Sequence, residues 1–178
     1  MTDQTYPGQF LTATPLISTP PFARSVILIL EHDETGAIGI ILNQDSGLAL
    51  DELLPEAAPH VVDPPNVFVG GPVGTETALG LASAPAGSFL RPAALGTIGL
   101  VDPMSPPSGV SAMRIFAGYA GWDPGQLEAE IEEQAWWVTL ADVDAIFGDT
   151  TDLWRETLRR APGRIPLFET YTDSPMSN

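Results

Sequence analysis

Two nearly unbroken apolar segments close to the N-terminus constrain the fold most strongly. Ser25–Glu31 holds five consecutive aliphatic residues, and Ala37–Asn43 holds three isoleucines and a leucine. Uninterrupted runs of this kind are typical of strands that are covered on both faces. The connecting residues 32–36 are few and include a glycine, as in a hairpin loop. We therefore expect a hairpin at the centre of a sheet, with other elements on each face.

Further strands are expected on both sides of this hairpin, because short apolar segments there are bounded by turn residues. These segments are Gln9–Thr14, Val67–Val69, Leu79–Ala82, Thr97–Val101, Met113–Tyr119 and Trp136–Leu140. In the last segment, strand alternation points the two adjacent tryptophans to opposite faces, so that one is available for a partner. A short helix is expected at Leu50–Leu54, where three leucines have i, i+3, i+4 spacing before Pro55.

The clearest helix start lies at Asp123, which has the features of an N-cap. Pro124 suits the first helical position, and Gln126 suits the capping-box position. Trp122 and Leu127 then occupy the two positions of a hydrophobic staple. This helix is expected to cover the sheet.

Two shorter helices are expected after the last strand. Asp142 can cap the first, and Gly148 stops it. The second runs over residues 152–160, with acidic residues near its start and arginines near its end, as the helix dipole favours.

The charge of the chain disfavours nucleic acid as a direct partner. The 178 residues include 23 acidic residues, seven arginines and no lysine, and the formal net charge is −16. Nucleic-acid binding draws its affinity mainly from cations that displace phosphate counterions. The absence of cysteine and lysine also excludes disulfides, thiol nucleophiles, iron–sulfur clusters, a P-loop lysine and a Schiff-base lysine.

The sequence shows no feature of a membrane or secreted protein. No apolar run approaches the roughly 18 residues of a spanning helix. Met1–Gln4 lacks the basic region of a signal peptide. We expect a cytoplasmic protein with no membrane partner.

Glu31, His32 and Asp33 form the most suggestive polar cluster, because all three residue types ligate metals or transfer protons. Alternation along a strand places Glu31 and Asp33 on one side and His32 on the other. Polar residues also belong at the mouth of a hairpin, where Asp33 can bond the turn backbone. The structural interpretation is favoured, and neither a metal nor a cofactor is expected.

The chain contains one weaker catalytic pattern and one further histidine. Ser25 and His32 are candidates for a nucleophile and its base, but the chain has no Gly-x-Ser-x-Gly elbow. His60 lies in a proline-rich loop, where a solvated histidine is expected. No catalytic residue is assigned.

Gly70-Gly71-Pro72-Val73 follows a predicted strand and can present N–H groups to an anion. Arg24 or Arg114 would supply the positive charge of such a pocket. A sharp turn that requires glycine explains the same residues, and the Walker and dinucleotide fingerprints are absent. The turn is the favoured interpretation.

The most distinctive motif is Gly118-Tyr119-Ala120-Gly121-Trp122, followed by Gly125-Gln126-Leu127-Glu128. Further motifs are Phe10–Pro15, Phe22–Ile27, Glu31–Asp33, Gly36–Gly39 and Gly70–Val73. Over roughly residues 8–160 the chain resembles the YqgE/AlgH family of bacterial proteins. The aromatic residues of the main motif can line a ligand site, or they can pack a strand against a helix.

The resemblance implies an α/β (α+β) fold, in which a mixed, bifurcated β-sheet forms a pseudo-barrel flanked by helices. We expect a single domain over residues 1–161. The proline-containing tail over residues 162–178 is expected to end in disorder. The family supplies no established catalytic residues, and one of its branches carries the label of a transcriptional regulator.

The favoured function is therefore a non-catalytic binding or regulatory protein that acts through a protein partner or self-association. The alternative is a small anionic-ligand-binding protein, or a hydrolase-like enzyme, with a pocket near the Gly-Gly-Pro-Val turn. A transcriptional regulator ranks third and is disfavoured as a direct DNA binder by the net charge. The candidate ligand-binding residues are Arg24, His32, Gly70, Gly71, Arg114, Tyr119 and Trp122.

Overall fold

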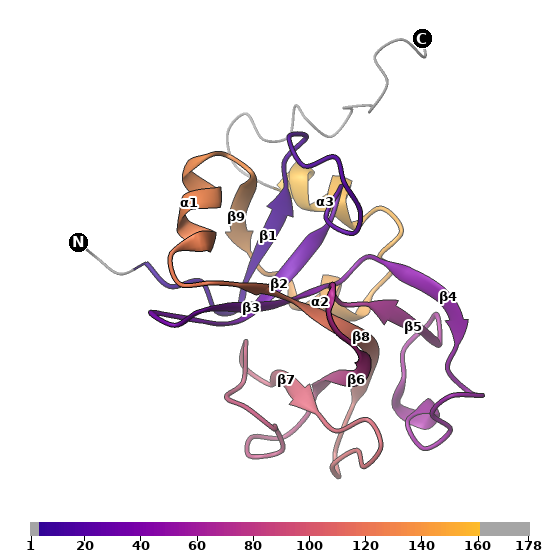
Figure 1. Ribbon diagram of the computed structural model, residues 1–178. Helices are drawn as coiled ribbons and strands as arrows, with labels where there is room; N and C mark the ends of the chain where they lie inside the picture. The colour runs from indigo at the N-terminus through magenta and orange to yellow at the C-terminus, as the bar shows by residue number, and fades with distance from the viewer. Residues whose placement is uncertain (1–3, 161–178) are drawn as a thin grey trace, which may run out of the picture.

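The predicted hairpin lies in the middle of a large sheet (Figure 1). In the computed structural model, which describes residues 4–160, the hairpin consists of β2 (Val26–Asp33) and β3 (Gly36–Ile41). On the far side of β2 lie β1 (Gln9–Ala13) and then β9 (Trp136–Leu140), each antiparallel to its neighbour. The central position of the hairpin is confirmed.

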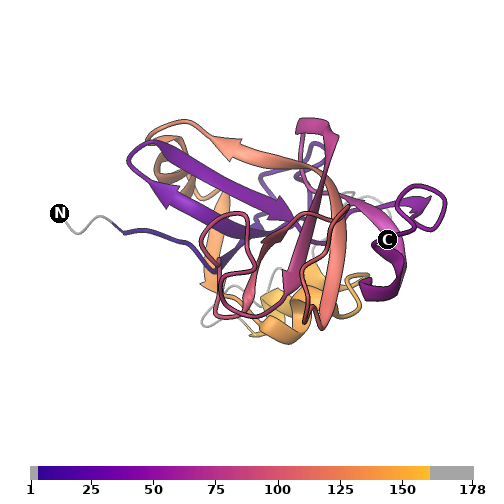
Figure 2. The ribbon, with the colours of Figure 1, turned by 90° about the horizontal axis from the view of Figure 1, so that it is seen from below.

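The sheet forks at β8 (Ala112–Trp122), because this long strand has different partners along its two halves. One edge of β8 pairs with β6 (Val73–Ser83). Its other edge pairs first with β5 (Asn66–Val69), in parallel, and then with β3, antiparallel. Figure 2 shows the two branches diverging from β8. The prediction of a mixed, bifurcated sheet is confirmed.

Two short strands complete the other branch of the sheet, which contains β5 and β6. Asp45–Ala49 forms β4, which pairs with β5, and Ile98–Val101 forms β7, which pairs with β6. β4 and β9 therefore lie at the two ends of the path β4-β5-β8-β3-β2-β1-β9.

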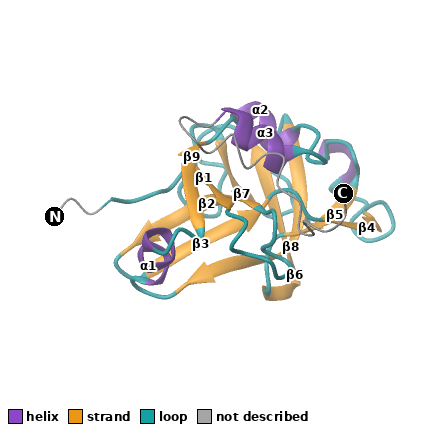
Figure 3. Ribbon diagram, turned by 90° about the horizontal axis from the view of Figure 1, so that it is seen from above, coloured by secondary structure: helices purple, strands orange, loops and turns teal. Residues whose placement is uncertain are grey.

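The helices cover opposite faces of the branch that contains β3, β2, β1 and β9 (Figure 3). On one face, Leu127 of α1 (Gln126–Glu132) shares a buried cluster with Ile27 and Ile29. On the other face, α2 (Val143–Phe147) and α3 (Leu153–Arg160) bury their apolar side chains against Val26, Leu28 and Leu30. β2 is thus buried on both faces, which explains its lack of polar alternation.

Two predicted helix positions are corrected. Leu50–Leu54 forms a single turn, in which the Leu53 and Leu54 N–H groups donate to the Leu50 carbonyl, and it does not continue into a helix. The i, i+3, i+4 spacing indicated a helix, but one turn fixes several backbone angles for few hydrogen bonds. Most of the turn's residues are exposed, so little packing offsets that cost.

The helix predicted to begin at Pro124 begins instead at Gln126, because β8 continues to Trp122 and a turn follows it. Gly125 occupies the N-cap with φ of +77°. Half of the predicted capping box is present, since the Asp123 N–H donates to Oε1 of Gln126 at 3.0 Å. The cap predicted at Asp142 is confirmed by a 3.0 Å hydrogen bond from the Asp144 N–H.

Within residues 4–160, no helix is long and apolar enough to cross a membrane. The predicted tail over residues 162–178 lies outside the described residues, so its disorder and the domain boundary before it stay predictions.

Candidate functional site

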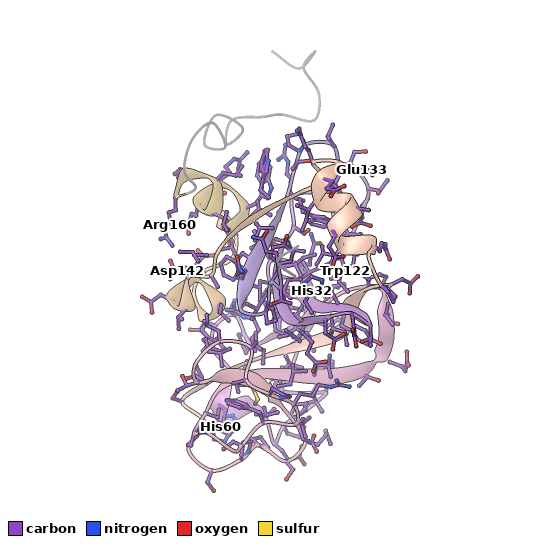
Figure 4. All side chains as sticks on the ribbon, turned by 90° about the vertical axis from the view of Figure 1, so that its left-hand side faces the viewer. His32, His60, Trp122, Glu133, Asp142 and Arg160 are labelled. Atoms are coloured by element: carbon purple, nitrogen blue, oxygen red, sulfur yellow. The ribbon has the colours of Figure 1, made fainter. Side chains whose placement is uncertain are left out.

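The seven candidate residues do not converge on one pocket. Figure 4 places His32 and Trp122 near α1, and His60 lies far from both, at the opposite end of the molecule. The side chains of Arg114 and Arg24 lie near α2 and α3 instead. Each position therefore has its own environment.

A β-bulge determines where the His32 side chain points. The β2–β3 register shifts between Ile29 and Glu31, so the alternation that places Leu28 and Leu30 in the cluster beneath α3 does not continue to His32, which points to the face covered by α1. The imidazole stacks on Tyr6 with centroids 5.2 Å apart, and its Nε2 lies 2.9 Å from Oε1 of Glu128. His32 is buried.

The neighbours of His32 have other partners. Glu31 accepts two hydrogen bonds of 3.0 Å from Arg91. Asp33 accepts hydrogen bonds from the Thr35 hydroxyl and N–H, and these lower the pKa of the Asp33 carboxyl. The predicted bond from Asp33 to the hairpin turn is confirmed. The described part of the chain has no group of three or more His, Asp or Glu side chains that could hold a metal.

The Ser25–His32 pair is excluded by the extended strand between its members. Ser25 directly precedes β2, and His32 lies seven residues further along it. At roughly 3.3 Å per residue, the two residues are about 23 Å apart. His60 lies at the end of a short 3₁₀ turn, η1 (Ala58–His60), and is half-buried there.

Arg114 is fully buried and donates to three backbone carbonyls. Its Nη1 lies 2.9 Å from the Ile146 oxygen, and its Nη2 lies 3.0 Å from the oxygens of Asp63 and Gly148. The guanidinium also lies 4.8 Å from the centroid of the Phe68 ring. Burial lowers the pKa of Arg114, whereas Asp45 and Asp149 oppose that shift. The side chain links β8 to the end of α2 and to the loop before β5.

Gly70 and Gly71 allow the backbone after β5 to approach β8 closely. A Cβ on Gly70 would lie 2.2 Å from the Gly118 oxygen, and one on Gly71 would lie 2.1 Å from the Tyr119 carbonyl carbon. Gly71 also has φ of +155°. Close packing thus accounts for both glycines. Tyr119 is half-buried and pairs with Val73 across the strands.

Arg24 lies two residues before the start of β2, next to α3. Its guanidinium lies 5.4 Å from the centroid of the Trp154 ring. Both side chains line a cavity of about 200 Å³, together with Asn43 and Arg155.

Trp122 belongs to a network that the sequence prediction did not contain. Its indole Nε1 and that of Trp136 both donate to Oε2 of Glu130, each at 2.8 Å. The other carboxylate oxygen accepts from Nε2 of Gln126 at 2.8 Å. Trp122, Trp136 and Glu130 line a cavity of about 310 Å³ with Phe22 and Ile17.

A second unpredicted feature is a groove beside β9, about 590 Å³ in volume. Asp142 and Arg160 form an ion pair at this groove, as Figure 4 shows. The groove residues come from β1, β9, α2 and α3, and they are Gln9, Phe10, Val138, Thr139, Leu140, Ala141, Asp142, Val143, Ala145, Thr157 and Arg160.

Comparison with known proteins identifies the family. The model of a family described as AlgH-like matches residues 10–166. The chain belongs to the AlgH-like family. Among its relatives, a UPF0301 protein from Streptomyces coelicolor is 44% identical, with 96% of this chain and 94% of the relative covered. A UPF0301 protein from Mycobacterium ulcerans is 40% identical, with 92% and 87% covered.

Two solved structures resemble this one. A crystal structure of a Corynebacterium diphtheriae protein has a TM-score of 0.85 and 33% identity, and 96% of this chain and 95% of that one are covered. The solution structure of AlgH from Pseudomonas aeruginosa has a TM-score of 0.68 and 28% identity, and 97% of each chain is covered. Both likenesses support the fold of this family member.

One stability prediction for this AlgH-like chain concerns Tyr6. Burial raises the pKa of the Tyr6 hydroxyl, and the nearby Glu128 carboxylate adds to this effect. A raised pKa means that folding favours the neutral phenol, so its stabilising contribution is complete below about pH 10 and is lost as the pH rises further. Urea unfolding between pH 8 and 11 should show a decline in stability above about pH 10 that Tyr6→Phe reduces. An identical decline in Tyr6→Phe would contradict this assignment.

Proposed function

We propose that this AlgH-like chain is a non-catalytic binding protein, and that its partner is an extended basic segment of another protein. The observation that carries the proposal is the open edge of β9 next to an apolar groove. Within the described residues, β9 ends the sheet and pairs only with β1. An extended segment can add to such an edge through main-chain hydrogen bonds, while its side chains enter the neighbouring pocket.

The sequence of β9 supports this role. Its five residues, Trp-Trp-Val-Thr-Leu, include no charge and no proline. Edge strands usually carry lysine, proline or a bulge, which prevent unwanted pairing. An apolar edge without such protection is typical of a strand that is covered by a partner.

The groove supplies apolar contacts and a free polar group. Leu140 is 87% exposed, and Val143 is also exposed. The Thr139 hydroxyl is buried and has no hydrogen-bond partner among the described residues. Because burying an unpaired hydroxyl is costly, a partner that supplies a hydrogen bond there would gain affinity.

The net charge favours a basic partner over the other classes. A chain with a charge of −16 attracts basic segments and repels both DNA and a second copy of itself. An anionic ligand at Gly70–Val73 is less favoured, because three of the Arg114 hydrogen bonds already go to backbone carbonyls.

Titration calorimetry with a short peptide of alternating lysine and valine tests this proposal. We expect the full chain to bind the peptide, and Leu140→Lys to weaken binding at least tenfold by placing a charge on the edge of β9. Leu48→Lys is the matched control, since Leu48 is 58% exposed on β4, the terminal strand at the other end of the sheet. Equal weakening by both substitutions, or no binding by the unmodified chain, would contradict the proposal.

A further inference from the structure

Beyond the binding of a protein segment, we infer that the cavity lined by Trp122, Glu130 and Trp136 binds a quaternary ammonium group. The cavity lies between α1 and the segment that contains Ile17 and Phe22. Its volume of about 310 Å³ is at the lower end of small-molecule pockets. This site is separate from the β9 groove and does not depend on it, since no residue lines both cavities.

A carboxylate that has no ion-pair partner among residues 4–160 lies in this cavity. Glu130 is half-buried, and its three hydrogen bonds come from neutral donors, namely the two indoles and the Gln126 amide. Among the described residues, no arginine forms an ion pair with Glu130. A negative charge that is removed from bulk water in this way interacts more strongly with a cationic ligand than a solvated one does.

Aromatic rings form the adjoining walls. The Phe22 and Trp136 rings have centroids 5.9 Å apart and meet at 87°, and the Trp122 and Trp136 rings are 6.2 Å apart and meet at 80°. Rings at right angles form a corner in which one cation contacts more than one aromatic group. Cations bind favourably to such walls, and tryptophan provides the strongest attraction.

The hydrogen-bonding pattern selects among cations. Glu130 already accepts three hydrogen bonds, and the Gln126 oxygen accepts from the Asp123 N–H. A primary ammonium would need acceptors for three N–H groups and would leave some of them unpaired. A quaternary ammonium has no N–H group, and its methyl groups suit the apolar walls. The geometry therefore favours a methylated ammonium over a primary one.

Choline is a suitable probe, and 3,3-dimethylbutan-1-ol is its neutral isostere. Binding to the full chain can be followed by intrinsic tryptophan fluorescence, because two of the four tryptophans line the cavity. We expect a saturable change with choline and at least tenfold weaker binding of the neutral isostere. Equal responses to both compounds, or no saturable response to choline, would overturn the inference.

Two variants locate the site. Glu130→Gln retains an oxygen that accepts from the indoles but removes the charge, so we expect choline binding to weaken at least tenfold. Glu133→Gln is the matched control, because Glu133 is exposed at the C-cap of α1 and does not line the cavity, so choline binding to this variant should be unchanged. If Glu130→Gln does not fold, Phe22→Leu removes one aromatic wall and should weaken binding several-fold. Unchanged binding in a folded Glu130→Gln or Phe22→Leu chain would place the choline elsewhere and contradict the inference.

Discussion

Replacing Arg114 by methionine is expected to lower the free energy of unfolding by about 3 kcal/mol or more. Methionine retains much of the apolar stem but donates no hydrogen bond, so three carbonyls lose their donor. Removing the guanidinium also removes the cost of burying its charge. The loss of hydrogen bonds should nevertheless dominate, because the bond to Ile146 is buried, those to Asp63 and Gly148 are partly buried, and all three carbonyls lose this donor.

Arg91→Met is the matched control for this experiment. Arg91 is also paired, with Glu31, but its side chain is 57% exposed. Exposed ion pairs typically contribute less than about 1 kcal/mol, so urea unfolding should separate the two variants clearly. Equal destabilisation by both substitutions would show that Arg114 is not the link between β8 and α2.

Gly71→Ala is expected to destabilise the fold by about 3 kcal/mol or more, through steric overlap and backbone strain. The added Cβ would lie 2.1 Å from a carbonyl carbon of β8, and neither neighbouring backbone can withdraw without breaking the fork of the sheet. The substitution therefore separates a packing role of the Gly-Gly-Pro-Val turn from a role in binding an anion.

Gly47→Ala provides the comparison, because Gly47 has φ of +74° but no atom within 4 Å of an added Cβ. Its cost should be limited to the backbone strain of roughly 1–2 kcal/mol. Thermal and urea unfolding measure both variants. A Gly71→Ala chain as stable as Gly47→Ala would show that close packing does not require glycine at the turn.

Local sequence signals predicted the parts of the fold that depend on local interactions. The uninterrupted aliphatic run of β2 indicated burial on both faces, and Val26 and Ile27 do pack in different clusters. The cap at Asp142 was predictable because an N-cap requires only one side chain and the backbone two residues on. Strand alternation also predicted that the side chains of Trp136 and Trp137 point to opposite faces of the sheet, where they pack in different clusters.

The family resemblance implied the fork of the sheet, but residue patterns alone could not predict it, because it depends on which distant strands β8 meets. The bulge beside Leu30 is a second example, since nothing in the aliphatic run marks an extra residue. Without that bulge, His32 would lie on the same face as Leu28 rather than against Tyr6. These features arise from pairing between strands that are remote in sequence.

The candidate site was predicted in part. The aromatic motif identified Trp122, but the staple role predicted for it indicated neither the cavity nor the acceptor Glu130, and it required a helix start at Asp123 that the structure does not have. The i, i+4 spacing of Gln126 and Glu130 is the local signal that was available. The β9 groove had no comparable signal, because it is assembled from four elements.

Hydrogen–deuterium exchange of the full chain, with and without the alternating lysine–valine peptide, tests the binding role of β9 most directly. The backbone amides on the outer edge of β9 should exchange rapidly in the free chain, and their exchange should slow at least tenfold when the peptide is bound. The exchange rates of the β4 amides should not change. Protection that is absent from residues 136–140, or equally strong at residues 45–49, would contradict the assignment of β9 as the binding edge.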